Sequence, residues 1–492
     1  MGQDIERRTF TPEDRTRFRQ KLRRCLQAHA QMLEEGRFDV GQPFVGFEIE
    51  FNLVDHKADP ALRNSELLHD LGDPAFQTEL AQYNIEVNVA PRRLEGSAFK
   101  EFEDDLRARI DAADATARRY GVRLAMVGIL PTVTTAHMTF DALSARTRYR
   151  LLNDQIILAR GEDIQIMIEG EETLAITTDS VAPESACTST QVHLQLSQEA
   201  FPAYWNAAQA IAGPQVAVCA NSPFFLGKEL WRETRTKLFE QAIDTRSLEL
   251  KEQGVRPRVW FGERWIESVG DLFTENVRYF PPLLPVCDDE DPMDLLAHDV
   301  TPGLSELRLH NGTIYRWNRP VYDVVDDSPH LRIENRVLPA GPTVVDTLAN
   351  AAFFVGLVRR LADDDRPVWA QLSFDAAAEN FFRGARFGLR AQQYWPASGM
   401  LGVPELMVRK LLPLAQEGLD IWGVDATQRD RLLGVIEQRC LSGQNGAEWQ
   451  AAVFHRLYDR GGMSRLETLR AMMSRYVENM STNAPVHTWP VE

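Results

Sequence analysis

Acidic residues recur on one side of several short segments in which apolar and polar residues alternate. Residues 45–53 place five apolar side chains on one side of an expected strand, with Glu48 and Glu50 on the other. Four later segments share this alternation, and their polar sides carry Glu86; Gln191 and His193; Glu306, Arg308 and His310; and Glu334 and Arg336. Side chains two residues apart on one strand face are only ~7 Å apart, so Glu48 and Glu50 repel each other unless cations lie between them. Carboxylates with an imidazole on one sheet face suit a hard divalent cation such as Mg²⁺, which in proteins often also binds substrate phosphates.

Arg336 follows Glu334 by two residues and should share its strand face, where a guanidinium could bind an anionic phosphate. An ordinary interpretation competes with this one. Alternation by itself indicates antiparallel strands with one face on the core and one face in water. The pattern alone leaves both readings open, a metal–phosphate site and exposed strands.

The surrounding sequence predicts the elements that must position these residues. Thr11, followed by Pro12 and Glu13, is typical of the start of a helix, here expected over 11–35. Short strands and helices then alternate from about 41 to 340, and the chain is mostly helical from about 343 onward. Further helices are expected around 203–219, from near 228, and over 403–418 and 463–480. A charged, proline-ended break at 363–367 suggests three parts, namely a helical extension (1–40), a catalytic part (41–366) and a C-terminal helical part (367–492) packed on the same domain.

Composition excludes several classes of protein. The 492 residues include 54 Lys and Arg against 71 Asp and Glu, a formal charge of 54 − 71 = −17, which disfavours nucleic acid as a partner. The acidic run 287–292 is expected to be a solvated surface loop. No secretory signal or membrane-spanning stretch is visible, so we expect a soluble protein. The cysteines are five in number, scattered and without a CxxC pair, which favours a reducing cytoplasm; they are Cys25, Cys187, Cys219, Cys287 and Cys440.

A series of motifs, in order along the chain, resembles the glutamate–cysteine ligase family of carboxylate–amine ligases. The motifs are Gly46-Phe47-Glu48-Ile49-Glu50, Ile85-Glu86-Val87, Gly128-Ile129-Leu130-Pro131 with Arg148-Tyr149, Cys187-Thr188-Ser189-Thr190-Gln191-Val192-His193, Ala220-Asn221-Ser222-Pro223-Phe224 with Gly227, and Ile333-Glu334-Asn335-Arg336. The resemblance implies an α+β fold of the glutamine synthetase type. In that fold about six antiparallel strands curve into a funnel, with helices outside it and metal-binding glutamates lining it.

The resemblance also implies a reaction. ATP phosphorylates a carboxylate, most simply the γ-carboxylate of glutamate, and an amine, most simply that of cysteine, then displaces phosphate. The product would be γ-glutamylcysteine, which belongs to glutathione biosynthesis. Mg²⁺ would bring together phosphates and a carboxylate that otherwise repel each other. Amino-acid or amine substrates are the expected partners, and the oligomeric state cannot be read from the sequence.

The resemblance assigns roles to individual residues. Those implied to bind metal are Glu48, Glu50, Glu86, His193 and Glu334. Those implied to contact the nucleotide are Gln191, His193 and Arg336, and those implied to act in catalysis are Glu48, Glu334 and Arg336. Three roles remain open for His193: a metal ligand, a phosphate contact or an ordinary hydrogen-bonded histidine. Arg336 would stabilise the transferring phosphoryl group, or else form a structural ion pair, as is expected for Arg332.

Substrate contacts are implied for Arg235 and Asn221. Arg235 would hold the amino-acid carboxylate from a helix beginning near Lys228, although its spacing from Asn221 is one residue short of the plant-type pattern. Asn221 lies in an Asn-Ser-Pro sequence that equally suits a tight turn shaping the funnel wall. The amine-binding region carries no recognisable signature, and residues 88–93 depart from the family pattern. Cys187 and Cys219 are expected to be buried packing residues.

Three alternatives remain beside a glutamate–cysteine ligase. The same chemistry could use another amine acceptor. A guanidino-type phosphotransferase shares the sheet architecture and uses ATP, but it would phosphorylate nitrogen and form no amide. A non-catalytic relative is the third, and the joint presence of Glu48, Glu50, Glu86, Glu334 and Arg336 argues against it.

Overall fold

A curved antiparallel sheet lies at the centre of the computed structural model, which describes residues 9–38, 41 and 43–492. Its order is β12-β13-β7-β1-β3-β2, and β4 pairs with the end of β1. The strands are β1 (Phe44–Val54), β2 (Phe76–Thr78), β3 (Asn84–Arg93), β4 (Arg123–Ala125), β7 (Thr190–Leu196), β12 (Asn318–Val325) and β13 (Ser328–Asn335). This arrangement confirms the predicted α+β class with a curved sheet of about six strands.

Four of the five alternating segments form strands of this sheet, namely β1, β3, β7 and β13. The prediction for residues 306–310 is wrong, because this segment lies in helix α10 (Ser305–Asn311). Leu304, Leu307 and His310 are buried at a spacing of three residues, which a helix places on one side. A segment of five residues is too short for its periodicity to separate a helix from a strand.

Both faces of the sheet are buried. The apolar face of β1 packs against helix α3 (Ala98–Arg118), where the rings of Phe47 and Phe102 meet edge to face at 4.7 Å. On the opposite face Glu50 is 7%, Glu86 1% and Glu334 2% exposed. The interpretation of these segments as ordinary strands with a solvated polar face is therefore wrong.

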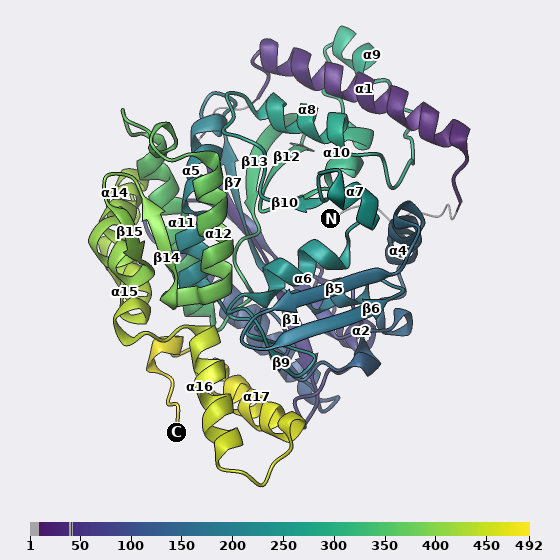
Figure 1. Cartoon of the computed structure of the whole chain (residues 1–492). Coiled ribbons are helices and arrows are strands. Elements are labelled where there is room, and N and C mark those ends of the chain that lie inside the picture. The colour runs from purple at the N-terminus through teal and green to yellow at the C-terminus, as the bar shows by residue number, and fades with distance from the viewer. Residues whose placement is uncertain (1–8, 39–40, 42) are drawn as a thin grey trace.

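Helices surround the sheet (Figure 1). The first, α1 (Pro12–Glu34), begins as predicted, with Thr11 and Asp14 forming a capping box. Besides α1, α3 and α10, the helices before the last strand of the sheet are α2 (Asn64–Leu71), α4 (Thr147–Arg160), α5 (Phe201–Cys219), α6 (Thr234–Ala242), α7 (Leu248–Glu252), α8 (Val269–Tyr279) and α9 (Pro292–Ala297). The helix expected from Lys228 begins instead at Thr234, because Lys228–Glu229 forms strand β9 and pairs with β8 (Phe224–Phe225).

The chain after the sheet is mostly helical, as predicted. Its helices are α11 (Val344–Ala362), α12 (Phe374–Phe387), α13 (Val403–Leu406), α14 (Leu412–Trp422), α15 (Ala426–Ser442), α16 (Gly446–Asp459) and α17 (Arg465–Ser481), with a π-helical turn at Met407–Leu411. Short strand pairs outside the main sheet are β5 (Ile164–Glu169) with β6 (Thr173–Thr178), β10 (Val259–Trp260) with β11 (Tyr315–Arg316), and β14 (Gln392–Trp395) with β15 (Gly399–Gly402). In Figure 1 α1 and α9 lie at one end of the molecule, and α16 and α17 at the other.

Two features bear on the class of protein. None of the helices in the described ranges combines the length and apolar character that crossing a bilayer requires. All five cysteines fall within the described residues, and each is a free thiol.

Close packing of α11 against α14 gives a test of the helical layer. A Cβ at Gly418 would collide with the backbone oxygen of Gly356, whereas a Cβ at Gly434, in α15, would meet nothing within 4 Å. We expect G418A to lower the free energy of unfolding by about 3 kcal/mol through overpacking. G434A should raise it by up to about 1 kcal/mol, because alanine favours a helix over glycine. Urea unfolding midpoints measure both, and an equal response of the two variants would contradict this packing.

Candidate functional site

The register of the sheet brings the predicted polar residues onto one continuous face. Glu50 on β1 lies directly opposite Glu86 on β3. On the other side of β1, Glu48 pairs with Gln191 of β7, and His193 then pairs with Glu334 of β13. Residues from four separate stretches of the chain therefore lie side by side.

Arginines neutralise the carboxylate at the β13 end of this face. Arg319 donates to Glu334 through Nε, at 2.9 Å from Oε2, and through Nη2. Arg336 also donates to Glu334 and reaches Gln191 Oε1 at 2.8 Å. Burial opposes ionisation of Glu334, but Arg319 and Arg336 outweigh it and hold the pKa of Glu334 well below its usual range. Arg319 was not predicted, because its strand lacks the alternation that marked the others.

His193 joins the two ends of the face. Its Nδ1 accepts a hydrogen bond from Arg332 Nε at 3.1 Å, so in the neutral ring the proton belongs on Nε2. Nε2 is buried and lies 3.2 Å from Glu48 Oε1, without the alignment of a hydrogen bond. This tautomer suits donation to an oxygen, such as that of a phosphate, better than ligation of a metal. Arg332 also pairs with Asp323 at 3.2 Å, in keeping with the expected ion pair.

At the β1–β3 end the carboxylates of Glu50 and Glu86 accept hydrogen bonds from neutral groups and not from cations. Glu50 accepts hydrogen bonds from the Ser189 backbone N–H at 2.7 Å and from Gln191 Nε2 at 3.0 Å. Glu86 accepts from Gln77 Nε2 at 3.0 Å and Asn88 Nδ2 at 2.9 Å, which are neutral donors. Burial and the charges of the neighbouring glutamates raise the pKa of Glu86 well above its usual value.

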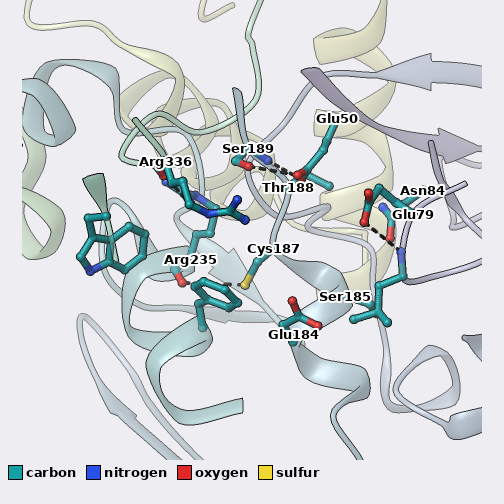
Figure 2. Close-up of a pocket in the computed structure, with 13 residues that line it drawn as sticks. Glu50, Glu79, Asn84, Glu184, Ser185, Cys187, Thr188, Ser189, Arg235 and Arg336 are labelled. Atoms are coloured by element: carbon teal, nitrogen blue, oxygen red, sulfur yellow. Dashed lines mark hydrogen bonds between the residues drawn. The ribbon is translucent and has the colours of Figure 1, made fainter. Parts of the chain in front are cut away.

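A cavity of about 60 Å³ adjoins this end of the face (Figure 2). At ~15 Å³ for each water, it has room for about four waters or a small polar group. Its lining residues are Glu50, Glu79, Leu80, Asn84, Glu184, Ser185, Cys187, Thr188, Ser189, Arg235, Phe239, Trp317 and Arg336. Sequence reasoning missed Glu79, Glu184 and Trp317. Glu184 precedes a recognised motif by three residues, and this proximity was the only available signal.

Two of these additional carboxyl groups are unusually basic. Burial, together with the charges of Glu50 and Glu184, raises the pKa of Glu79 to about 8. Burial and Glu50 likewise raise the pKa of Glu184 to about 8, although Arg336 opposes the shift. Both carboxyl groups therefore keep their protons to a higher pH than an ordinary glutamate does, and a ligand that brings positive charge would favour their ionised forms.

Arg235 lies on the cavity wall, and much of its hydrogen-bonding capacity is used within the protein. Its guanidinium donates to the backbone oxygen of Val337 at 2.6 Å and to that of Arg336 at 3.3 Å, and it pairs with Glu233 at 2.8 Å. It also stacks 5.5 Å from the centre of the Trp317 ring. Arg235 thus fixes the backbone that carries Arg336.

Asn221 is not brought to the cavity. It is fully buried, and its Nδ2 lies 2.7 Å from the Ala340 backbone oxygen and 2.8 Å from Tyr476 Oη. Its backbone N–H donates to Glu233 at 2.8 Å. These contacts give Asn221 a structural role in the wall, which agrees with the turn interpretation of Asn-Ser-Pro.

The residues fit magnesium by their chemistry. Glu48, Glu50 and Glu86 supply the oxygen ligands that Mg²⁺ prefers, and the raised pKa of Glu86 reflects a repulsion that a cation would relieve. In the described part of the chain, however, no three His, Cys, Asp or Glu side chains converge closely enough to hold an ion as they stand. For a metal to bind here, some carboxylates would have to turn from their present donors.

Comparison with known proteins identifies relatives. A family model described as glutamate-cysteine ligase family 2 (GCS2) matches residues 44–468. A search of curated protein sequences finds no match to the chain.

Solved structures also resemble it. A glutamate–cysteine ligase from Francisella tularensis, in complex with AMP, aligns with a TM-score of 0.53 and 11% identity, covering 93% of this chain and 91% of that one. A bifunctional glutathione synthetase from Pasteurella multocida aligns with a TM-score of 0.49 and 10% identity, covering 93% of this chain and 55% of that one. A complex of the prokaryotic ubiquitin-like protein Pup with its ligase PafA aligns with a TM-score of 0.37 and 10% identity, covering 86% of this chain and 70% of that one. The first of these similarities shows a shared fold.

The raised pKa of Glu79 predicts a pH-dependent stability. Between about pH 5 and pH 8 the folded protein keeps a proton on Glu79 that the unfolded chain releases, so the free energy of unfolding falls as pH rises. The limiting slope for one group is ~1.4 kcal/mol per pH unit. We expect E79Q to match the wild type at pH 5 and to exceed it in stability at pH 8, in urea unfolding without Mg²⁺. An equal difference at both pH values would contradict the assignment.

Proposed function

Because the chain belongs to glutamate–cysteine ligase family 2, we propose that it is an ATP- and Mg²⁺-dependent ligase that joins glutamate to cysteine. ATP phosphorylates the glutamate γ-carboxylate, and the cysteine amine then displaces phosphate to give γ-glutamylcysteine. The match to the family covers most of the chain and supports the carboxylate–amine ligase class. The AMP present in the Francisella tularensis ligase, which shares the fold, supports a nucleotide as co-substrate.

One observation carries the proposal, namely a buried sheet face that is acidic at one end and rich in arginine at the other. Glu50 and Glu86 are nine-tenths or more buried and lack cationic partners in direct contact, whereas Glu334 is paired with Arg319 and Arg336. A reaction between ATP and a carboxylate needs cations between two anions and a fixed positive group beside the transferred phosphoryl group. The two ends of this face supply these requirements separately.

The chain's own side chains have distinct parts in this scheme. Glu48, Glu50 and Glu86 would hold Mg²⁺, with Glu334 and His193 at the border of the metal site and the phosphates. Bound there, Mg²⁺ would neutralise the phosphates and the attacking carboxylate. Arg336 has its guanidinium fixed by Glu334 and Gln191, so it is oriented before the substrate binds. His193 presents its Nε2 proton toward the same region, and the burial of the face limits the access of water.

The alternative functions differ in product. A guanidino-type phosphotransferase would not need the uncompensated glutamates at the β1–β3 end, because arginines would hold its nucleotide. Another amine acceptor would leave every residue role above unchanged. We further propose that the protein works in a reducing compartment such as the cytoplasm, which its five free thiols support.

Product mass tests the reaction. We expect the purified chain with ATP, Mg²⁺, glutamate and cysteine to release ADP and phosphate and to form a product lighter than the two amino acids by one water. A panel of other amines in place of cysteine identifies the acceptor. A product heavier by one phosphoryl group would indicate the phosphotransferase, and no turnover with any amino-acid pair would remove the ligase.

Glu48→Gln tests the metal assignment. Loss of one anionic ligand should reduce kcat/KM by roughly 100-fold or more and raise the Mg²⁺ concentration needed for activity. The fold should persist, because the substitution keeps the size of the side chain. Glu199→Gln, at an exposed position, is the matched control and should leave activity unchanged. Full activity of Glu48→Gln would show that the metals lie elsewhere.

A further inference from the structure

The cavity beside the sheet has two carboxylates, Glu79 and Glu184, that the proposed metal and phosphate contacts do not use. Glu184 lies in a single 3₁₀ segment, Ala182–Ala186, outside the sheet. In Figure 2 it lies on the opposite side of the cavity from Glu50, which belongs to the sheet. It therefore faces the proposed reaction centre from a separate wall.

Glu184 differs from Glu50 and Glu79 in having no hydrogen-bond donor of its own. Within the described part of the chain, no side chain or backbone N–H donates a hydrogen bond to its carboxylate. Glu79 Oε2, by contrast, accepts from the Leu80 N–H at 3.1 Å, and Glu50 accepts three hydrogen bonds. The Glu184 side chain is partly buried, and because no group among the described residues donates to its carboxylate, the carboxylate remains available to a ligand that supplies a donor.

The protein's own cations near the cavity are already engaged. Arg235 donates to backbone oxygens and to Glu233, and Arg336 donates to Glu334 and Gln191. Two aromatic rings, those of Phe239 and Trp317, line the same cavity and meet edge to face at 6.1 Å. A small ligand with a cationic N–H group and an apolar part matches this mixture of walls better than a hydrated metal ion does.

We propose that Glu184 binds the ammonium group of the amine substrate and accepts its proton as the nitrogen attacks the activated carboxylate. This inference rests on the proposed ligase function and names the missing amine-binding residue. One ammonium proton passes to Glu184, and the freed nitrogen lone pair forms the bond to the acyl carbon. The bond from that carbon to the phosphate oxygen breaks, phosphate leaves with the electron pair, and the second nitrogen proton leaves with it.

One further observation agrees with this role. The raised pKa of Glu184, about 8, makes it a stronger base than an ordinary carboxylate.

Comparing two nucleophiles in the full-length protein tests the inference. With ATP, Mg²⁺ and glutamate present, cysteine enters as an ammonium, whereas hydroxylamine is largely uncharged at pH 7 and traps an acyl phosphate as a hydroxamate. We expect E184Q to raise the KM for cysteine by roughly 10- to 100-fold, the effect of losing a charged hydrogen-bond partner. Hydroxamate formation, the KM for glutamate and the Mg²⁺ requirement should stay at wild-type values. E184D, which keeps the charge, should recover part of the affinity for cysteine.

Glu169→Gln is the matched control, since Glu169 ends strand β5 with an exposed side chain and should tolerate the change. Equal loss of peptide and hydroxamate in E184Q, or no loss of either, would overturn the role of Glu184. A higher Mg²⁺ requirement with an unchanged KM for cysteine would assign Glu184 to a metal and overturn it too. If the wild type itself forms neither product, the ligase function fails and the inference fails with it. Unchanged thermal unfolding of E184Q separates each result from misfolding.

Discussion

Burial of like charges on one sheet face is the constraint on which the rest of this structure depends. Carboxylates from β1, β3 and β13 lie within a few residue spacings of one another, away from bulk water. Such a cluster is costly unless protons, arginines or bound cations offset it. At the β13 end arginines offset the charge of Glu334, whereas at the β1–β3 end the raised pKa of Glu86 reflects burial and repulsion that remain. The protein's own groups therefore offset only part of the free-energy cost of burying these carboxylates.

The two ends of the polar sheet face therefore differ in charge. At the β13 end Glu334 accepts hydrogen bonds from Arg319 and Arg336, so the protein itself fixes the position of these two positive groups. At the β1–β3 end Glu50 and Glu86 accept hydrogen bonds only from neutral donors, and the proposed function gives them cations as partners. His193 lies between the two ends, with its proton placed by Arg332. Pre-orientation of this kind is how phosphoryl transfer is accelerated without covalent help from the protein.

Elements far from the sheet hold the cavity wall. Tyr476 of α17 contacts Asn221, and the backbone N–H of Asn221 donates to Glu233, which in turn pairs with Arg235. The C-terminal helices therefore support the position of Arg235 through a chain of buried hydrogen bonds. Sequence reasoning assigned Asn221 and Arg235 directly to the substrate, and this assignment stays a prediction. A linear motif does not show which of its polar atoms are engaged inside the fold.

The sequence by itself determined the residue types and the faces they share. Alternation over Val45–Leu53 and its counterparts predicted the strands, and the motifs predicted the family and the curved sheet, since strand periodicity and short motifs are local properties. Tertiary structure decided the rest. Only folding could bring Glu79, Glu184 and Trp317 to the cavity, pair Arg319 with Glu334, or show that 306–310 is helical. Contacts between distant segments depend on register and packing, and no local pattern records them.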